Sequence, residues 1–378
     1  MVHRIIFEQI IKDFQSSNRA IIIYGARRIG KTTLLKEIEK YLQQPVLWIN
    51  GDEMPNTSIF ENVTIEKLRF LFKDYKYIFV DEAQKIKNIE TAIKLTIDNL
   101  PDKRIIATGS SAFGLSTKLK ETLTGRVWEY QMFPFSFQEL ADHYGSINEI
   151  NNLENRLIYG SYPEVVLNPD QAERVLLNLM DSTMFKDIFA FEGVKKPEIL
   201  TKLVTALAFQ IGSEVKLREL AVLIGTDKNT VDRYLTVLER TFIIFHLGSF
   251  SRNLRGEIKN GRKYYFWDTG LRNAVINNFN HINLRDDIGQ LWENFLVSER
   301  IKYLKNNNIR TNSYFWRTYT QQEIDYIEER QGKLLAFEFK WNPRRKGKLP
   351  KSFIETYNAS FKRISTDNYF EFLTDNLF

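Results

Sequence analysis

Cysteine is absent from all 378 residues of the chain. Disulfide bonds, thiolate zinc sites and cysteine nucleophiles are therefore excluded, and the composition fits a reducing compartment such as the cytoplasm. Long apolar runs are absent too, since no stretch approaches the roughly 18–20 residues that a membrane-spanning helix needs. The start of the chain, Met1 to Glu8, carries an acid where a signal peptide has its apolar stretch. We therefore expect a cytoplasmic protein with no membrane partner.

The composition is that of a globular protein, with 43% hydrophobic and 26% charged residues. The length predicts about two or three domains. The 53 basic residues exceed the 47 acidic ones, which leaves a net charge of +6. Most of this mild excess is concentrated in residues 251–263. A local cluster of this kind favours a partner with negative charge.

Short runs rich in β-branched and aromatic residues alternate with longer amphipathic stretches in the first third of the chain. This alternation predicts a parallel α/β sheet. The runs lie at residues 20–24, 45–50, 77–81, 104–108 and 127–132. A mostly helical region is predicted up to about residue 210. A helix after Asp287 and strand-like segments at residues 312–318, 323–328 and 334–340 predict a second α/β unit.

The segment from Gly25 to Thr32 reads Gly-Ala-Arg-Arg-Ile-Gly-Lys-Thr and fits the phosphate-loop pattern G-x-x-x-x-G-K-[ST]. The glycines let the backbone curl so that its N–H groups point at a phosphate, and Lys31 adds a charge for the β- and γ-phosphates. A strand precedes the loop and a helix follows it, which places the phosphates at a helix N-terminus. We predict that Gly25, Gly30, Lys31, Thr32 and Thr33 bind ATP, with the Thr32 hydroxyl on Mg²⁺.

Two adjacent acids, Asp81 and Glu82, end the third strand-like run. We predict that Asp81 holds the Mg²⁺ ion and that Glu82 orients and deprotonates the attacking water. The fourth run ends in hydroxyl residues, among which Ser110 is the candidate sensor of the γ-phosphate. Serines after a strand are also ordinary turn formers.

Residues 20–135 resemble an AAA-type P-loop ATPase of an archaeal and bacterial group. Besides the phosphate loop, the resemblance rests on three stretches, Gly109-Ser110-Ser111, Leu123-Thr124-Gly125-Arg126 and Phe133-Pro134-Phe135-Ser136. It implies an ATPase core over residues 1–134, a helical lid over residues 135–210 and a homo-oligomeric ring such as a hexamer. It also implies that Arg126 completes the site of a neighbouring subunit, although a lone arginine before a strand is as often only solvated.

Two predicted helices joined at Gly225 carry apolar residues at i, i+3, i+4 and i+7, which is typical of a helix-turn-helix. A hairpin with a basic loop follows, so residues 211–280 are predicted to form a winged helix. Its polar and basic side chains can reach phosphates or base edges. The candidate DNA-binding residues are Lys228, Arg233, Arg252, Arg255, Lys259, Arg262 and Lys263. Winged helices also serve as protein-packing modules, so that alternative stays open.

Two later strands bring acids and a lysine together. Alternation along a strand puts Glu338 and Lys340 on one face, and hairpin pairing brings Asp325 beside them. With Glu293 on the preceding helix, these residues resemble the core of the PD-(D/E)xK nucleases. The resemblance implies a restriction-endonuclease-like α/β domain over residues 281–378, in which Glu293, Asp325 and Glu338 bind Mg²⁺ and Lys340 assists the attacking water. Such a site can also be vestigial and serve only for binding.

Three functions remain open from the sequence. The leading hypothesis is an ATP-driven, oligomeric motor or remodeller of duplex or branched DNA, because the same order of ATPase core, lid and winged helix recurs in branch-migration and replication-initiator ATPases. The second is a nucleotide-gated signalling switch for which DNA is incidental. The third is a Mg²⁺-dependent DNA nuclease whose ATPase regulates access.

Overall fold

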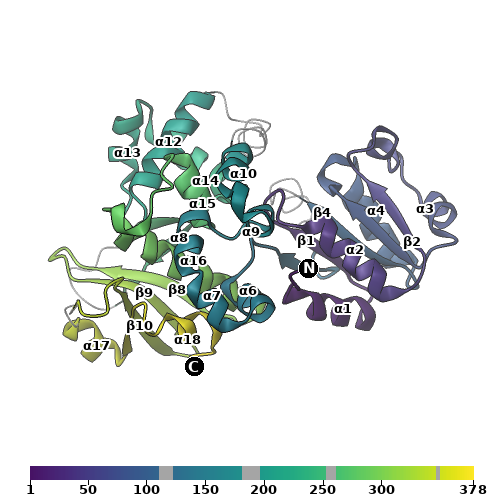
Figure 1. Cartoon of the computed structure of the whole chain (residues 1–378). Coiled ribbons are helices and arrows are strands. Elements are labelled where there is room, and N and C mark those ends of the chain that lie inside the picture. Colours follow the sequence, from purple (N-terminus) through teal and green to yellow (C-terminus); the bar gives the residue numbers. More distant parts are fainter. Residues whose placement is uncertain (110–121, 181–195, 253–260, 346–349) are drawn as a thin grey trace. The chain divides into compact units, whose positions relative to one another are not determined.

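The computed structural model describes residues 1–109, 122–180, 196–252, 261–345 and 350–378. Three candidate residues, Ser110, Arg255 and Lys259, lie outside the described residues. The chain folds into two compact units, one of Met1–Phe133 with Arg240–Phe242 and one of Pro134–Glu239 with Ile243–Phe378. Figure 1 shows the first unit in purple to blue and the second in teal to yellow. Within the described ranges, no helix combines the length and the apolar character needed to cross a membrane.

The first unit is built on a five-stranded parallel sheet in the order β2-β3-β4-β1-β5, which confirms the predicted fold class. Its strands are β1 (Ala20–Tyr24), β2 (Val46–Asn50), β3 (Tyr77–Asp81), β4 (Arg104–Gly109) and β5 (Val127–Gln131). Its helices among the described residues are α1 (Ile6–Ser16), α2 (Lys31–Leu42), α3 (Ile65–Phe72) and α4 (Ile89–Asn99), with short 3₁₀ turns at Met54–Ser58 and Ala83–Lys85.

Helices cover both faces of this sheet, as the continuous apolar strands require. On one face, Ile22 of β1 joins a buried cluster with Phe72 of α3 and Ile93 of α4. Because side chains alternate along a strand, Phe79 of β3 points to the other face, where its ring contacts Phe14 of α1. With both faces closed, the carboxyl edge of the parallel strands is the place left for a ligand site.

The second unit holds a six-stranded mixed sheet in the order β11-β10-β9-β8-β6-β7. Its strands are β6 (Ile244–Ser249), β7 (Arg262–Phe266), β8 (Asn312–Arg317), β9 (Glu323–Arg330), β10 (Lys333–Phe339) and β11 (Ser360–Ile364). The predicted hairpin between β9 and β10 is confirmed, with Arg330 opposite Lys333. Gln331 and Gly332 between them both have positive φ, as a two-residue type I′ turn requires.

The described residues of the second unit also form many helices. They are α6 (Phe137–Tyr144), α7 (Ser146–Asn151), α8 (Leu153–Tyr159), α9 (Pro163–Leu167), α10 (Ala172–Asn178), α12 (Pro197–Phe209), α13 (Leu217–Ile224), α14 (Lys228–Arg240), α15 (Thr269–Val275), α16 (Ile288–Asn306), α17 (Lys351–Tyr357) and α18 (Tyr369–Thr374), with 3₁₀ turns at Pro169–Gln171 and Ile282–Leu284. The helix α16 is buried along most of its length and carries buried polar residues as well as apolar ones.

The predicted hairpin of β6 and β7 is present, with Ile244 opposite Phe266, but it does not stand alone. It belongs to the six-stranded sheet, because β6 pairs in parallel with β8 through Gly248↔Tyr314 and Ser249↔Phe315. The boundary predicted at residue 280 therefore does not separate two sheets. Pairing between strands more than sixty residues apart leaves no local periodicity, which is why the sequence did not reveal it.

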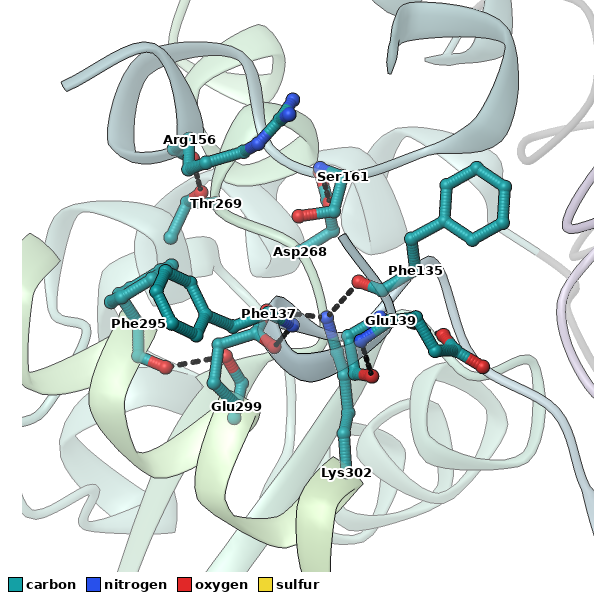
Figure 2. A network of polar contacts seen from close by, with 12 residues as sticks. Phe135, Phe137, Glu139, Arg156, Ser161, Asp268, Thr269, Phe295, Glu299 and Lys302 are labelled. Carbon is teal, nitrogen blue, oxygen red and sulfur yellow. Dashed lines mark hydrogen bonds and ion pairs between the residues drawn. The ribbon is translucent and has the colours of Figure 1, made fainter. Parts of the chain in front are cut away.

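A buried polar network joins the first residues of the second unit, around Phe135 and Phe137, to α16 (Figure 2). The Nζ of Lys302 lies 2.7 Å from Glu299 Oε1 and 3.3 Å from the carbonyl oxygen of Phe135. The backbone N–H of Phe137 donates to the other oxygen of Glu299 at 2.7 Å. Because burial raises the pKa of Glu299, the Lys302 charge and these donors are what stabilise its carboxylate.

In the same region, position 160 has no room for a side chain. Gly160 has φ +70°, and a Cβ there would lie 2.1 Å from Asp268 Oδ1. That carboxylate accepts a hydrogen bond from the Ser161 N–H at 2.6 Å and caps α15 by accepting from Leu271 N–H at 3.0 Å. A larger residue at position 160 would displace Asp268 from both bonds.

Candidate nucleotide-binding site

The phosphate loop joins β1 to α2, and two glycines shape it. At Gly25 a Cβ would lie 2.2 Å from the carbonyl oxygen of Met132 and 2.6 Å from Ile29 Cδ1, so a side chain would displace the backbone. Gly30 has φ +95° and precedes Lys31, the first residue of α2. The unpaired N–H groups of the first turn and the helix dipole both attract an anion at this end.

Lys31 holds its charge inside the curl of the loop. Only 5% of the residue is exposed, and Nζ donates to the carbonyl oxygens of Gly25 at 3.0 Å and Ala26 at 2.7 Å. Rotation of the side chain can exchange these carbonyls for phosphate oxygens without moving the helix. The lysine is therefore placed as a phosphate-binding lysine is in a P-loop.

Asp81 ends β3 and contacts the first turn of α2. Its Oδ2 accepts a hydrogen bond from the Thr32 hydroxyl at 2.7 Å, and its Oδ1 accepts one from the Thr108 hydroxyl. A carboxylate and a hydroxyl in direct contact supply the hard oxygen ligands that Mg²⁺ prefers. The chemistry of Thr32 and Asp81 thus fits a Mg²⁺ ion.

Glu82 follows Asp81 in the left-handed conformation, with φ +50°. Few residues other than glycine adopt this conformation, and neighbouring groups hold it here. The Glu82 N–H lies 3.2 Å from Asp81 Oδ1 and 3.3 Å from Thr108 Oγ1. The Gln84 side chain donates to Glu82 Oε2 at 2.5 Å. These contacts direct a half-buried carboxylate to the edge of the sheet where the phosphate loop lies.

Two residues that support the site were not predicted from the sequence. Thr108 bonds to Asp81 and lies against the Glu82 N–H, and its signal was a hydroxyl inside an otherwise apolar strand. Arg4 is 5% exposed and donates to the carbonyl oxygen of Ile29 in the phosphate loop. No local pattern marks Arg4, because 25 residues separate the two partners.

The remaining nucleotide-site candidates differ in position. Thr33 is exposed on the first turn of α2. Arg126 immediately precedes β5, whose register pairs Val127 with Ala20 at the start of β1, so Arg126 lies at the opposite end of β1 from the phosphate loop. Its guanidinium contacts Asp98 at 2.7 and 3.1 Å. Arg126 therefore does not line the nucleotide site of its own chain.

The nuclease-like candidates lie in the second unit on α16, β9 and β10. Lys340 Nζ lies 2.9 Å from Glu338 Oε1, which confirms that the two share a face. Asp325 Oδ2 accepts the Phe339 N–H at 2.8 Å. Burial, with the nearby charge of Glu293, raises the pKa of Asp325 to about 7.

These acids do not assemble as predicted. Across the described part of the chain, no three acids or histidines form a group that could hold a metal ion. The observed arrangement therefore gives no support to the prediction that Glu293, Asp325 and Glu338 bind Mg²⁺, and it stays a prediction. The physical reason is that Glu293 already has a cation, since its Oε1 lies 3.1 Å from Lys263 Nζ.

The prediction of Lys263 as a DNA-binding residue is wrong. Its side chain is 1% exposed and its Nζ contacts both Glu293 and Glu323. Lys263 lies in β7, whose residues 263–266 are all buried, and a count of charges in a supposed loop cannot detect this burial.

The other DNA-binding candidates are arranged in two groups. Lys228 and Arg233 are exposed on α14. Arg252 is paired with Glu329 at 2.6 Å, and Arg262 with Asp232 at 3.2 Å. These ion pairs are partly exposed, so they hold the two arginines only weakly.

Three family models match successive parts of the chain. Residues 17–141 match a model described as an AAA domain. Residues 150–281 match a domain of unknown function (DUF8612), and residues 288–370 match another (DUF4143). An uncharacterized protein of Haemophilus influenzae is 27% identical over 301 residues, 73% of this chain and 74% of that protein. An uncharacterized protein of Methanocaldococcus jannaschii is 24% identical over 375 residues, 93% of this chain and 80% of that protein.

Solved structures give weaker likenesses. A Walker-type ATPase of Pyrococcus abyssi has 16% sequence identity and a TM-score of 0.49, over 71% of this chain and 94% of that one. The Holliday-junction branch-migration motor RuvB of Thermotoga maritima has 15% identity and a TM-score of 0.33, over 72% of this chain and 93% of that one. The AAA-domain match and the observed sheet agree with each other: the first unit has the fold of an AAA-type P-loop ATPase.

Proposed function

We propose that the chain hydrolyses ATP at the phosphate loop. The observation that carries this proposal is the 2.7 Å contact between the Thr32 hydroxyl and Asp81, which joins the phosphate loop to the acidic end of β3. The buried ammonium of Lys31 lies in the same loop, and Glu82 is the next residue after Asp81. In this proposal, the residues for phosphate binding, metal binding and base catalysis lie at one edge of the sheet.

Each residue has a distinct role in this proposal. Lys31 places its charge against the β- and γ-phosphate oxygens of ATP. Thr32 and Asp81 hold Mg²⁺, which when bound supplies positive charge to those oxygens. Glu82 orients the attacking water and accepts its proton.

Release of phosphate from Mg-ATP by the full chain tests this proposal. Asp81→Asn keeps the shape of the side chain but weakens its hold on Mg²⁺, so turnover should fall by about a hundredfold or more. Asp74→Asn, at an exposed acid elsewhere in the first unit, is the matched control and should leave turnover unchanged. Equal turnover in both variants would contradict the assignment of Asp81.

For the second unit, we propose that α13 and α14 contact duplex or branched DNA, which makes the chain an ATP-driven DNA remodeller. Gly225 ends α13 in the left-handed conformation, and Asp227 caps the next helix by accepting from the Thr230 N–H at 2.9 Å. The apolar face of α14 is buried, which leaves Lys228 and Arg233 exposed. This is the arrangement in which a helix-turn-helix presents cations to phosphates.

Fluorescence anisotropy with duplex and four-way-junction DNA tests the DNA contact. The double variant Lys228→Ala and Arg233→Ala should bind more weakly. If each residue contacts a phosphate, the slope of log affinity against log salt should also flatten by about 2. The control Lys333→Ala removes an exposed lysine on β10 and should change neither quantity. Unchanged affinity and slope in the double variant would remove α14 from the account and favour the nucleotide-gated switch, for which DNA is incidental.

A further inference from the structure

The interior of the second unit contains a fully buried lysine surrounded by carboxylates. Lys263 Nζ lies 3.1 Å from Glu293 Oε1 on α16 and 2.5 Å from Glu323 Oε1 on β9. Burial by itself lowers the pKa of Lys263, but the charges of Glu293, Glu323 and Asp325 raise it above its ordinary value. The ammonium group therefore stays charged at neutral pH.

Two carboxylate oxygens near Lys263 have hydrogen-bond donors besides the lysine. Glu293 Oε1 also accepts a hydrogen bond from the Tyr265 hydroxyl at 2.8 Å. Asp325 Oδ2 accepts the Phe339 N–H. An ammonium group is a compact cation with three donors, so it satisfies several carboxylates at once much as a small metal ion does.

A divalent cation at this place would need the same oxygens of Glu293 and Glu323. It would also lie a few ångströms from the Lys263 charge, in an interior where repulsion between cations is poorly screened. We propose that the Lys263 ammonium occupies the place of a divalent cation among Glu293, Glu323 and Asp325. This cluster of three acids therefore binds no catalytic metal.

The arrangement gives the cluster a different role. Lys263 belongs to the segment matched by one family model, residues 150–281, and its two partners belong to the segment matched by the next, residues 288–370. The ion pairs hold β7 against α16 and β9 and so join the two segments in one sheet. The third function considered above, metal-dependent cleavage of DNA, is excluded by this proposal.

Binding of Mn²⁺ to the full chain, followed by the electron paramagnetic resonance signal of free Mn²⁺ without nucleotide, tests the proposal. All proteins carry Asp81→Asn, which removes the acid of the phosphate-loop site. Lys263→Met vacates the cation position and should bind one further Mn²⁺ per chain, at least about tenfold more tightly than the parent. Lys263→Arg keeps the charge, and Lys333→Met removes an exposed lysine instead, so both controls should bind as the parent does.

Mn²⁺ binding by the parent protein still tests the proposal if Lys263→Met fails to fold. Its Mn²⁺ titration should coincide with that of a further variant carrying Asp325→Asn, because no metal is held there. Stoichiometric Mn²⁺ binding by the parent that Asp325→Asn abolishes would overturn the proposal. Equal Mn²⁺ binding by a folded Lys263→Met variant and by Lys263→Arg would also overturn it.

Discussion

At the scale of single residues, the hydroxyl of Thr108 organises both acids of the nucleotide site. It donates to Asp81 and lies within hydrogen-bond distance of the Glu82 N–H. Asp81 would hold the metal and Glu82 would activate the water. Thr108 therefore holds the Asp81 carboxylate and the Glu82 backbone in place relative to each other. It acts through its neighbours and is a positioning residue.

Replacement of Thr108 by valine should lower the turnover number for ATP about tenfold while nucleotide binding persists. Valine keeps the branched shape but leaves Asp81 without one donor, so the acids lose their fixed orientation. Steady-state kinetics with a parallel nucleotide-binding titration separates the two effects. The matched control is Thr96→Val in α4, where another buried hydroxyl bonds only to the carbonyl oxygen of Ala92 among the contacts described. Equal kinetics for the two variants would contradict the role of Thr108.

Gly25→Ala should abolish nucleotide binding. The added Cβ would meet the carbonyl oxygen of Met132 at 2.2 Å, so the loop or β5 must move and the curl around the phosphates is lost. Fluorescent-nucleotide binding measures the effect. Gly289→Ala in α16, where nothing lies within 4 Å of the new Cβ, is the control and should bind nucleotide normally. Normal binding by Gly25→Ala would show that the loop tolerates a side chain.

At the scale of elements, the turn before α16 depends on one acid that serves two arginines. Asp287 accepts from Arg285 Nε at 2.8 Å and from Arg272 Nη1, and both arginine side chains are almost fully buried. Removal of the acid leaves two buried cations without their shared partner. Breaking a buried pair in this way costs far more than loss of a surface ion pair.

Asp287→Asn should lower the free energy of unfolding of the second unit by about 3 kcal/mol at neutral pH. Denaturant unfolding measures it, with Asp286→Asn at the exposed neighbouring acid as the control. A loss no larger than that of Asp286→Asn would show that the arginines are stabilised by other groups.

The contribution of Asp287 to stability should also depend on pH. Burial alone would raise the pKa of Asp287, but Arg285 and Arg272 hold it below its ordinary value. Its stabilisation is therefore complete above the ordinary pKa of about 4 and is lost as pH falls through the lowered folded-state value. The stability gap between wild type and Asp287→Asn should thus be constant near neutral pH and close in strong acid. A gap that widens on acidification would contradict this assignment.

Some elements of the structure could be predicted from the sequence, and others could not. Strand positions such as Ala20–Tyr24 and Tyr77–Asp81, and the loop from Gly25 to Lys31, follow from local periodicity and motif chemistry, and the structure confirms these elements. The burial of Lys263 and the pairing of β6 with β8 depend on contacts between distant segments. Charge and periodicity within a window cannot encode such contacts, so the sequence predicted neither of them.

At the scale of the whole molecule, the position of Arg126 bears on assembly. It lies at the end of β1 away from the phosphate loop, so an arginine acting on ATP from this position must act on a neighbouring chain. In the isolated chain Asp98 pairs with it. We propose that assembly exchanges this partner for the nucleotide of the neighbour.

Mixing of two inactive variants tests the role of Arg126. Arg126→Ala keeps its own site intact but cannot complete another, whereas Lys31→Ala lacks a working site but supplies Arg126. Each protein alone should be inactive, and a mixture should recover part of the phosphate release because mixed interfaces contain one complete site. A mixture containing Arg126→Ala and a chain with both substitutions is the control and should stay inactive. Full activity of Arg126→Ala alone would contradict the proposal.

The central claim is that this chain hydrolyses ATP with Glu82 as the base, and one variant tests it most directly. Glu82→Gln keeps the size of the side chain and its amide can still accept from Gln84, but it cannot take a proton from water. Phosphate release and retained nucleotide are measured on the same samples, with Glu66→Gln on the exposed face of α3 as the control. The account predicts that Glu82→Gln binds ATP and releases almost no phosphate, while Glu66→Gln behaves as wild type. Near-normal phosphate release by Glu82→Gln would contradict it.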